Sequence, residues 1–539
     1  MILESGGIRI VTCVLACFGS LPAAIPRASA DEFRTPSVSM LHADWRAALD
    51  QIKADVNARP AIAGSLTFVE RRRVPRFDPR ARPALVQLNA VTAELFPGIR
   101  RSPVPVLLPF DTAAYLESRQ GADRPPVALS NYQSGFRAVD LFDAGPAGYD
   151  AVFSLPPGSM DGLSSRIFAR AVEVQITGSL LIYDLADPRG GTGEAVKTLS
   201  AQFPDLRRFI REGYVRYAFT RFGIPYVVSI QCLDSTPRAQ RLACREAYPV
   251  AERFLQALHV AGGMPATLRR DINSEVAERP PTASPDFSYR PSGDIIAGSG
   301  VGKQGGHSDF TVYAQMRFPL LAPPVFAHSQ SYQGKKTKDQ PDEIIGSNTS
   351  YPWQDNFCES RSFNVGQCPA GNGHQGQDLR PAPCQQRDDG SSLCDTRQQT
   401  VVAVRDGTII RAPTAQAATL QINTANEHLR FRYMHMNPAT MDSDDLLNGR
   451  RVEEGEKIGV VSNYMDHPNG TSHHLHFDVQ AFTRDGWVWV NPYVTLIAAY
   501  ERLIGGRGRE VGPEPISAAV AHALPEDVLR PAPSRPDGN

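Results

Sequence analysis

The chain has no excess of charge of either sign. Its 539 residues include 56 Lys and Arg against 57 Asp and Glu, a formal net charge of −1, and charged residues make up 21% of the sequence. Proteins that bind nucleic acid or anionic membranes over a broad surface carry a strong positive charge. Neither partner class is expected here. The length is sufficient for two or three domains.

Short motifs of several enzyme and metal-binding classes are also missing. No Cys-x-x-Cys pair occurs, so the thiolate pairs typical of a closed structural zinc site are not available. Residues 31–270 contain no nucleotide-binding loop, no Ser-His-Asp signature and no internal repeat. The acids and arginines scattered over that part are most simply explained as solvated surface, and its role stays open.

The first thirty residues have the layout of an export signal. Arg9 precedes an apolar run at 10–21, and a small-residue Ala-Ser-Ala tripeptide ends at Ala30. The apolar run is too short to span a membrane as a helix. We therefore predict a signal peptide over 1–30, a periplasmic or secreted protein, and no stable membrane span once the signal is removed.

Cysteine usage agrees with export. Six cysteines remain after signal removal, in three couples separated by 12, 10 and 10 residues. Short loops cost little entropy to close, and an oxidising compartment preserves disulfides. Buried thiols are the alternative. The predicted bonds are Cys232–Cys244, Cys358–Cys368 and Cys384–Cys394. The last two couples flank His374, which suggests stapled loops at the rims of a cleft.

Residues 31–270 are expected to form an α+β domain of unknown role. Leu41, Trp45 and Leu49 recur at helical spacing, whereas the stretch from Ala171 alternates as a strand does. The expected elements are helices at 39–57, 206–222 and 238–260, the last kinked or broken at Pro249, and strands at 171–177 and 226–230.

Residues 271–539, the rest of the chain, are divided into segments as follows. Residues 271–340 are rich in Pro, Ser, Gly and charge at their start and are expected to be a linker or irregular arm, with a strand at 311–319. A further domain is expected over 341–505. The Pro-rich tail, 506–539, is expected to be mostly disordered.

The densest chemistry lies between His374 and His476, a window that holds seven of the twelve histidines. A strand points residues i, i+2 and i+4 to the same face. His374 and Asp378 are four apart, and His474 and His476 are two apart. Two such strands side by side can bring two imidazoles and a carboxylate to one cation, with a fourth imidazole nearby. Three N/O ligands with an open position form a catalytic zinc site.

At these residues the chain resembles the lysostaphin/LytM-type zinc metallopeptidases, which cut peptidoglycan peptides. The resemblance rests on His374-Gln-Gly-Gln-Asp378, on Tyr433-Met-His435, on His474-Leu-His476-Phe-Asp, and on the connecting segments from Val401 and Val452. It covers roughly residues 345–495. It implies that the C-terminal domain, 341–505, is a mainly antiparallel β, LytM-like peptidase. Together with the α+β N-terminal domain, this makes the expected fold class α+β multidomain.

The resemblance also implies roles for five residues and a substrate. His374, Asp378 and His476 would bind one Zn²⁺ per chain. His474 would act as general base, and His435 would position water or stabilise the oxyanion. The substrate would be peptidoglycan, cut in its cross-links or stem peptides, and protein partners are left unknown.

Other residues in the window receive simpler interpretations. His473 lies on the opposite strand face and is a bystander, and His428 and His467 are solvated loop histidines. Asp478 either supports a ligand imidazole or is an exposed strand residue, and we favour exposure. An insertion at 380–400 separates this chain from the usual family pattern and puts substrate specificity in doubt.

Two other functions stay open. A catalytically silent domain of the same fold could activate another cell-wall hydrolase, although such domains typically lose metal ligands. An exported zinc peptidase could instead act on proteins. If the chain is a peptidoglycan peptidase, the N-terminal domain would position or restrain the enzyme, or cover its groove in a resting state.

Overall fold

The computed structural model describes most of the chain between residues 35 and 505. The described residues are 35–59, 62–66, 81–120, 127–158, 171–185, 193–211, 213–232, 242–265, 311–328, 353, 355–358, 374–381, 385–386, 392–393, 397 and 399–505. The predicted signal peptide and C-terminal tail lie outside these ranges. Within the described residues, no helix is both long and apolar enough to cross a membrane.

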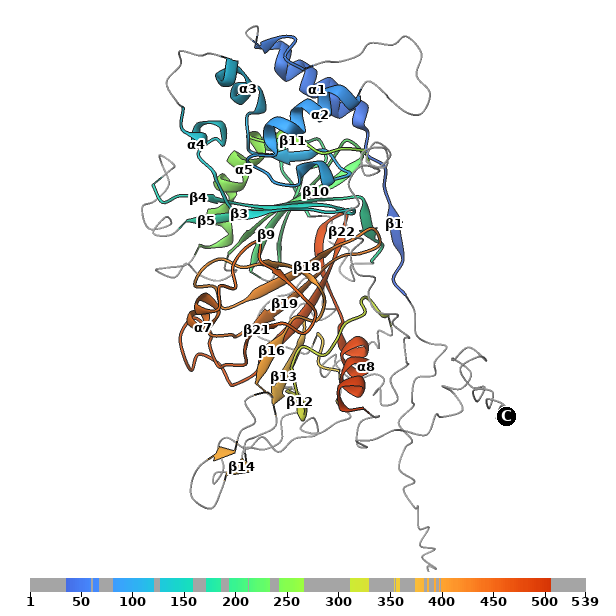
Figure 1. The fold of residues 1–539 in the computed structure, drawn as a ribbon, viewed down its shortest axis with the longest axis vertical. Coiled ribbons are helices and arrows are strands. Elements are labelled where there is room, and N and C mark those ends of the chain that lie inside the picture. Colours follow the sequence, from blue (N-terminus) through green and yellow to red (C-terminus); the bar gives the residue numbers. More distant parts are fainter. Residues whose placement is uncertain are drawn as a thin grey trace, which may run out of the picture.

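The N-terminal unit is an antiparallel sheet covered on one face by helices (Figure 1). In spatial order its strands are β3 (Arg137–Ala144), β4 (Gly148–Leu155), β5 (Val172–Ser179), β10 (Ile224–Gln231), β9 (Tyr214–Arg221), β8 (Arg207–Arg211) and β7 (Glu194–Ala195). The helices are α1 (Trp45–Asn57), α2 (Ala81–Thr92), α3 (Thr112–Gln120), α4 (Leu129–Tyr132) and α5 (Tyr248–Gln256). This part is α+β, as predicted.

Short elements complete the N-terminal unit. Strand β1 (Val38–Met40) pairs with β6 (Leu181–Tyr183), and β2 (Val106–Leu108) pairs with β11 (His259–Gly262). Among the described residues of this unit, 3₁₀ turns occur at η3 (Ile99–Arg101), η4 (Lys197–Leu199) and η5 (Cys244–Ala247). The strands predicted at 171–177 and 226–230 are confirmed as parts of β5 and β10.

The helix predicted at 39–57 is correct only from residue 45 onward. Asp44 is its N-cap and accepts a hydrogen bond from the Ala47 amide at 3.0 Å, whereas strand β1 ends at Met40 and residues 41–44 belong to no regular element. The kinked helix predicted at 238–260 is also wrong in detail. Helix α5 begins at Tyr248, and Pro249 lies in its first turn, where a missing N–H leaves no hydrogen bond unmade, so it does not break the helix.

The helix predicted at 206–222 is wrong. These residues form the β8–β9 hairpin, which turns at Gly213 with a φ of +73°. Val215, Tyr217 and Phe219 point into the N-terminal core, at the period of a strand. The alternation is hard to see in the sequence because the opposite face of β9 is buried as well, against the C-terminal unit.

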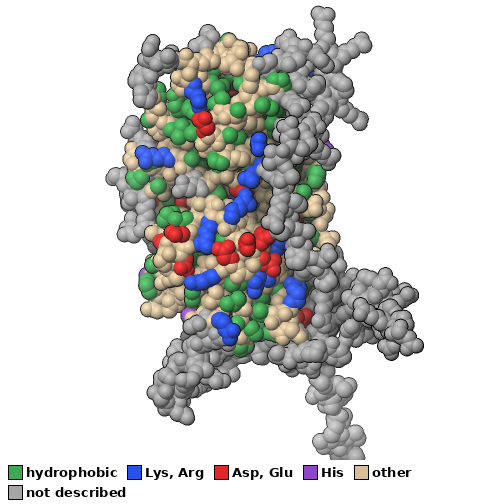
Figure 2. Space-filling model, in the orientation of Figure 1, with side chains coloured by type: hydrophobic (Ala, Val, Ile, Leu, Met, Phe, Trp, Pro, Cys, Tyr) green, Lys and Arg blue, Asp and Glu red, His purple; other side chains and the backbone are tan. Residues whose placement is uncertain are grey.

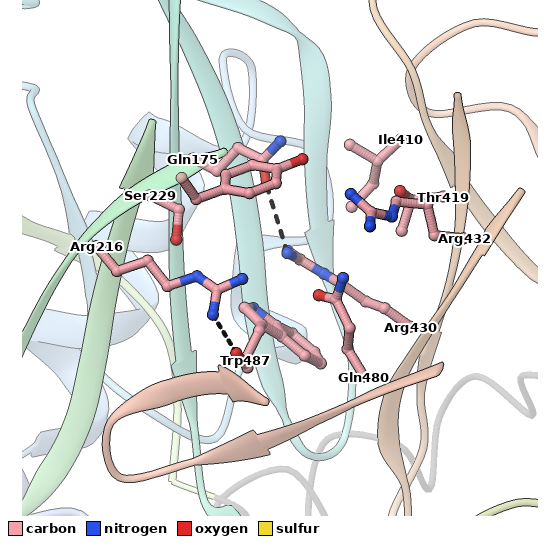
Figure 3. Close-up of a pocket in the computed structure, with 10 residues that line it drawn as sticks. Gln175, Arg216, Ser229, Ile410, Thr419, Arg430, Arg432, Gln480 and Trp487 are labelled. Carbon is pink, nitrogen blue, oxygen red and sulfur yellow. Dashed lines mark hydrogen bonds between the residues drawn. The ribbon is translucent and has the colours of Figure 1, made fainter. Parts of the chain in front are cut away.

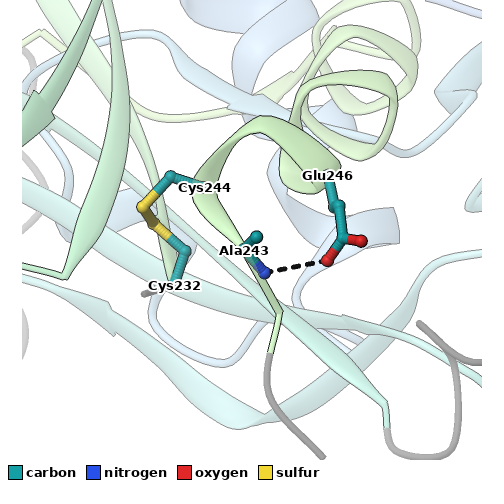
Figure 4. The surroundings of a disulfide bond; sticks show 4 residues. All are labelled: Cys232, Ala243, Cys244 and Glu246. Carbon is teal, nitrogen blue, oxygen red and sulfur yellow. Dashed lines mark hydrogen bonds between the residues drawn. A yellow bond between two sulfur atoms is a disulfide. The ribbon is translucent and has the colours of Figure 1, made fainter. Parts of the chain in front are cut away.

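The first predicted disulfide is confirmed. Cys232 and Cys244 are bonded, and the connection ties the end of β10 to the turn that leads into α5 (Figure 4). The Glu246 carboxylate accepts from the Ala243 amide at 3.0 Å beside this bond. Cys358 is also disulfide-bonded. Cys368, Cys384 and Cys394 lie outside the described residues.

The C-terminal unit is built on a second antiparallel sheet, as predicted. Its spatial order is β12 (Val325–His328), β13 (Gln377–Pro381), β22 (Leu475–Thr483), β19 (His428–Met434), β18 (Ala418–Asn423), β17 (Gly407–Ile410) and β20 (Arg451–Val452), with β23 (Gly486–Val490) also paired to β22. Smaller pairs are β16 (Thr400–Val402) with β21 (Lys457–Val460) and β14 (Gln385–Gln386) with β15 (Ser392–Leu393). The helices are α7 (Pro438–Ser443) and α8 (Tyr493–Ile504).

Residues 311–328, placed by the sequence in a linker, belong to this unit. The strand predicted at 311–319 is largely absent, because only Thr311 makes a bridge, but Met316 and Phe318 are buried in the C-terminal core. Strand β12 pairs with β13. The unit therefore begins well before residue 341.

The two units pack sheet against sheet through polar side chains. The Asp150 carboxylate lies 2.9 Å from His428 Nε2 and 2.9 Å from Arg430, and the Gln421 amide donates to it at 2.6 Å. The prediction that His428 is a solvated loop residue is wrong, since its exposure is 0% and it begins strand β19. A buried ion pair needs such additional hydrogen bonds to offset its desolvation.

The outer surface agrees with the near-neutral composition. Figure 2 shows acidic and basic side chains interspersed across the middle of the face in view. Mixed charge of this kind does not attract a polyanion over a broad surface.

Candidate metal centre

Strand pairing brings two members of the predicted metal site together. In the β13–β22 ladder Asp378 is directly opposite His476. Directly opposite residues of antiparallel strands point to the same face, with close Cβ atoms. His374 lies just before β13, and all three side chains are buried.

The donor atoms form a compact triangle. His374 Nε2 is 2.8 Å from His476 Nδ1 and 3.0 Å from Asp378 Oδ1, and His476 Nδ1 is 3.1 Å from the same oxygen. Zinc binds imidazole nitrogen and carboxylate oxygen at about 2.0–2.2 Å. Three donors about 3 Å apart fit one small ion at that distance. The residues are therefore able to hold a metal ion.

Charge in the cluster also favours a cation. Burial alone would raise the pKa of Asp378, but the adjacent imidazoles of His374 and His474 lower it well below its usual value. Burial would likewise lower the pKa of His476, but the adjacent carboxylates of Asp378 and Asp478 raise it to about 9. The carboxylates favour positive charge at this position, and a bound cation supplies that charge in place of a proton.

Two further imidazoles face the triangle in their neutral form. His474 Nδ1 donates to the Ser472 carbonyl at 2.6 Å, and His435 Nδ1 donates to the Tyr464 carbonyl at 3.1 Å. Because a carbonyl only accepts, the proton of each neutral ring lies on Nδ1 and the lone pair on Nε2. Burial lowers the pKa of His474, and it lowers the pKa of His435 to about 3.

The two rings are adjacent, and one lone pair points at the cluster. The centroids of His435 and His474 are 4.7 Å apart, and His474 Nε2 lies 3.5 Å from Asp378 Oδ1. A neutral imidazole held this way can accept a proton next to a bound metal. The structure thus gathers all five predicted site residues.

Asp478 is a buried partner of a cluster residue, so the favoured prediction of an exposed position is wrong. Its exposure is 0%, and its Oδ2 lies 3.3 Å from His476 Nε2, an ion-pair distance without hydrogen-bond geometry. Arg432 Nε donates to the same oxygen at 2.7 Å, and Trp489 Nε1 donates to Oδ1 at 3.1 Å. A carboxylate on the second nitrogen orients a ligand imidazole and fixes its tautomer.

A glycine is required between the first two members of the cluster. A Cβ on Gly376 would lie 2.5 Å from the Phe477 carbonyl oxygen and 2.9 Å from His476 Nε2. Only a residue without a side chain allows β13 this close to β22. The predicted bystanders behave as expected: His473 is exposed with Nε2 on the Val461 carbonyl, and His467 is exposed.

Comparison with known proteins confirms the motif-based resemblance for part of the chain. Residues 387–492 match Peptidase family M23. The matched range includes His435, His474 and His476 but begins after His374 and Asp378. In the folded chain these two residues lie next to His476. The match therefore supports the resemblance to a peptidase over residues 387–492.

One solved structure is also similar. It is a candidate glycyl-glycine endopeptidase LytM from Ruminococcus gnavus, with 19% sequence identity and a TM-score of 0.18. The match covers 23% of this chain and 47% of that one, so this chain spans about half of its length. No curated protein sequence matches the chain.

Proposed function

We propose that the chain is an exported zinc metalloendopeptidase that hydrolyses peptide bonds in the cross-links or stem peptides of peptidoglycan. The observation that carries the proposal is the cluster of His374, Asp378 and His476, whose donor atoms lie about 3 Å apart beside two neutral imidazoles. The match to a peptidase family over 387–492 supports the reaction class.

The five site residues have different roles in the proposed reaction. His374, Asp378 and His476 would hold one zinc ion, which when bound supplies Lewis acidity towards a carbonyl and lowers the pKa of water. The lone pair on His474 Nε2 accepts the proton of the attacking water and returns it to the leaving amine. His435 lies beside His474, where its ring helps to position the water or the developing oxyanion.

Export is supported by two features. The N-terminal thirty residues have the layout of a signal peptide. The Cys232–Cys244 disulfide persists in an oxidising compartment. The periplasm or the cell exterior, where peptidoglycan is accessible, is therefore the proposed location.

The competing functions are less well supported. A silent regulator of another hydrolase needs no intact cluster, whereas here three candidate ligands and both auxiliary imidazoles converge. A zinc peptidase acting on proteins would use the same cluster. The substrate, not the site, separates that function from the proposed one.

The test compares the mature protein with His476→Ala and, as a matched control, His473→Ala. Each is assayed for bound metal and for release of peptides from purified peptidoglycan and from a protein panel. About one zinc per chain, lost together with peptidoglycan cleavage in His476→Ala but retained in His473→Ala, is expected. Zinc without turnover would favour the regulator. No zinc in the wild type would contradict the proposal.

A further inference from the structure

The two sides of the metal cluster differ along strand β22. The sheet face beyond His476 is covered by the N-terminal unit, whose Arg216 donates to the Trp487 backbone carbonyl (Figure 3). On the other side of His476 lies His474, at the end of the loop that joins β21 to β22, residues 461–474. The middle of this loop is exposed. The loop contacts both auxiliary imidazoles, so its contacts decide how they are held.

The backbone of His435 has an unusual conformation. Its φ is +66°, in the left-handed region that residues with a Cβ rarely adopt. Such a conformation persists only where the surrounding contacts enforce it. The ring of the same residue donates from Nδ1 to the Tyr464 carbonyl at 3.1 Å, and its centroid lies 4.7 Å from that of His474. The contacts that enforce the backbone of His435 therefore also fix where its ring lies.

The Ser462 side chain supplies one of these contacts. Its hydroxyl donates to the His435 backbone carbonyl and accepts from the Tyr464 amide at 3.2 Å. Because the Tyr464 carbonyl accepts from the His435 ring, the three residues form a closed circuit of hydrogen bonds. Hydrogen bonds that are linked in this way polarise and strengthen one another. The hydroxyl is thus connected to the backbone of His435 directly and to its ring through Tyr464.

The main chain of the same serine contacts the other auxiliary residue. The His474 amide donates to the Ser462 carbonyl at 3.1 Å, and the two residues form an antiparallel bridge. The His474 ring is held separately, because its Nδ1 donates to the Ser472 carbonyl at 2.6 Å. A change of the Ser462 side chain therefore leaves the contact to His474 in place and acts on His435.

We propose that Ser462 is a positioning residue, whose hydroxyl holds the His435 imidazole beside the metal cluster in the orientation that hydrolysis requires. The inference rests on the proposed peptidase function and adds a residue to it. Without the hydroxyl, the left-handed backbone of His435 loses a contact that enforces it, so the backbone relaxes and the ring moves. A displacement of about 1 Å in a catalytic site costs on the order of 10²-fold in rate.

The experiment compares Ser462→Ala with Ser462→Thr, which retains the hydroxyl, in the full mature chain. Ser443→Ala is the matched control, because the Ser443 hydroxyl also donates to a backbone carbonyl, at 2.8 Å, but is exposed on α7. Bound zinc, kcat and KM are measured with a soluble cross-linked stem peptide. In Ser462→Ala we expect kcat to fall at least about tenfold, with zinc content and KM unchanged, because the lost interaction matters only in the transition state. Ser462→Thr and Ser443→Ala should retain kcat.

Three results would overturn the inference. One is a kcat of Ser462→Ala within about twofold of the wild type, and another is an equal loss in Ser462→Thr. The third is loss of zinc together with activity, since Ser462 would then support the cluster and not His435. If Ser462→Ala does not fold, Ser462→Val replaces it. Valine has the shape of threonine without the hydroxyl, so the difference between Ser462→Val and Ser462→Thr gives the same test.

Chemical labelling separates this inference from the proposed function. Diethyl pyrocarbonate modifies accessible neutral imidazoles, and mass spectrometry measures the rate at His435 whether or not the protein is active. We expect His435 to react at least about fivefold faster in Ser462→Ala than in the wild type or in Ser462→Thr, because a released ring is more accessible. This difference in a wild type that cleaves no peptide would refute the peptidase and support the positioning role. Equal labelling rates in all variants would overturn the positioning role, even in an active enzyme.

Discussion

Replacing Asp478 by asparagine tests whether the buried carboxylate supports the metal cluster. One Asp478 oxygen accepts from Arg432 at 2.7 Å and lies 3.3 Å from His476 Nε2, and the other accepts from Trp489 at 3.1 Å and from Gln480 at 3.4 Å. An asparagine offers one oxygen and one NH₂ group. One pair of donors therefore faces another donor in the variant, whichever way the amide is turned.

The magnitude follows from which contacts are lost. Removing the carboxylate that orients a ligand imidazole typically costs about 10–100-fold in metal affinity. Loss of the charge-assisted bond to Arg432 costs a further ~1.5–3 kcal/mol of folding free energy, because a buried guanidinium loses its anionic partner. Both effects act in the same variant, so they are measured separately.

Metal affinity is measured by competition with a chromophoric chelator, and stability by urea unfolding of the metal-free protein. Asp442→Asn is the matched control, since Asp442 pairs with Arg411 at 2.7 Å in the same unit but is 34% exposed. We expect weaker metal binding only in Asp478→Asn. A metal affinity within about twofold of the wild type, in a folded variant, would refute the supporting role.

Three further predictions concern the buried Asp150 ion pairs between the two units, the close approach of β13 to β22 at Gly376, and the Cys232–Cys244 disulfide. Burial alone would raise the pKa of Asp150, but His428 and a neighbouring arginine lower it, so its stabilisation is present above the usual value of 3.8 and is lost as pH falls through the lowered value. Asp150→Asn should lower the free energy of unfolding by ~3–5 kcal/mol at pH 7 and reduce the loss of stability as the pH falls. An unchanged loss of stability at low pH would contradict this. Gly376→Ala should reduce metal content because the methyl group meets the Phe477 carbonyl, and full metal occupancy would contradict the steric argument. Cys244→Ser should lower unfolding free energy by ~2–3 kcal/mol, and a melting temperature equal to the wild type would exclude that contribution.

Local patterns made part of the fold and most of the site predictable. The separation of 12 residues between two cysteines predicted the Cys232–Cys244 bond, because closing a short loop costs little conformational entropy. The alternation in 171–177 predicted a strand of β5 because its two faces differ in composition. The hairpin at 206–222 was missed because both faces of β9 are buried, which removes the alternation.

The local sequence pattern also could not predict where the C-terminal unit begins. Residues 311–328 are irregular in sequence, yet Met316 and Phe318 pack into the C-terminal core and β12 extends its sheet. Contacts with residues distant in the sequence decide which unit such a segment belongs to. Composition alone placed the segment in a linker.

The amino-acid sequence by itself determined which side chains carry the chemistry. His474 and His476 share a strand face through a two-residue spacing that any extended chain preserves, and His374 and Asp378 share the spacing of four. Only the tertiary structure decided what covers that face. A polar strand face has the same period whether it meets water or another polar sheet, so Asp478 gave no local sign of its burial. Its burial depends on the packing of a second sheet, which no local spacing encodes.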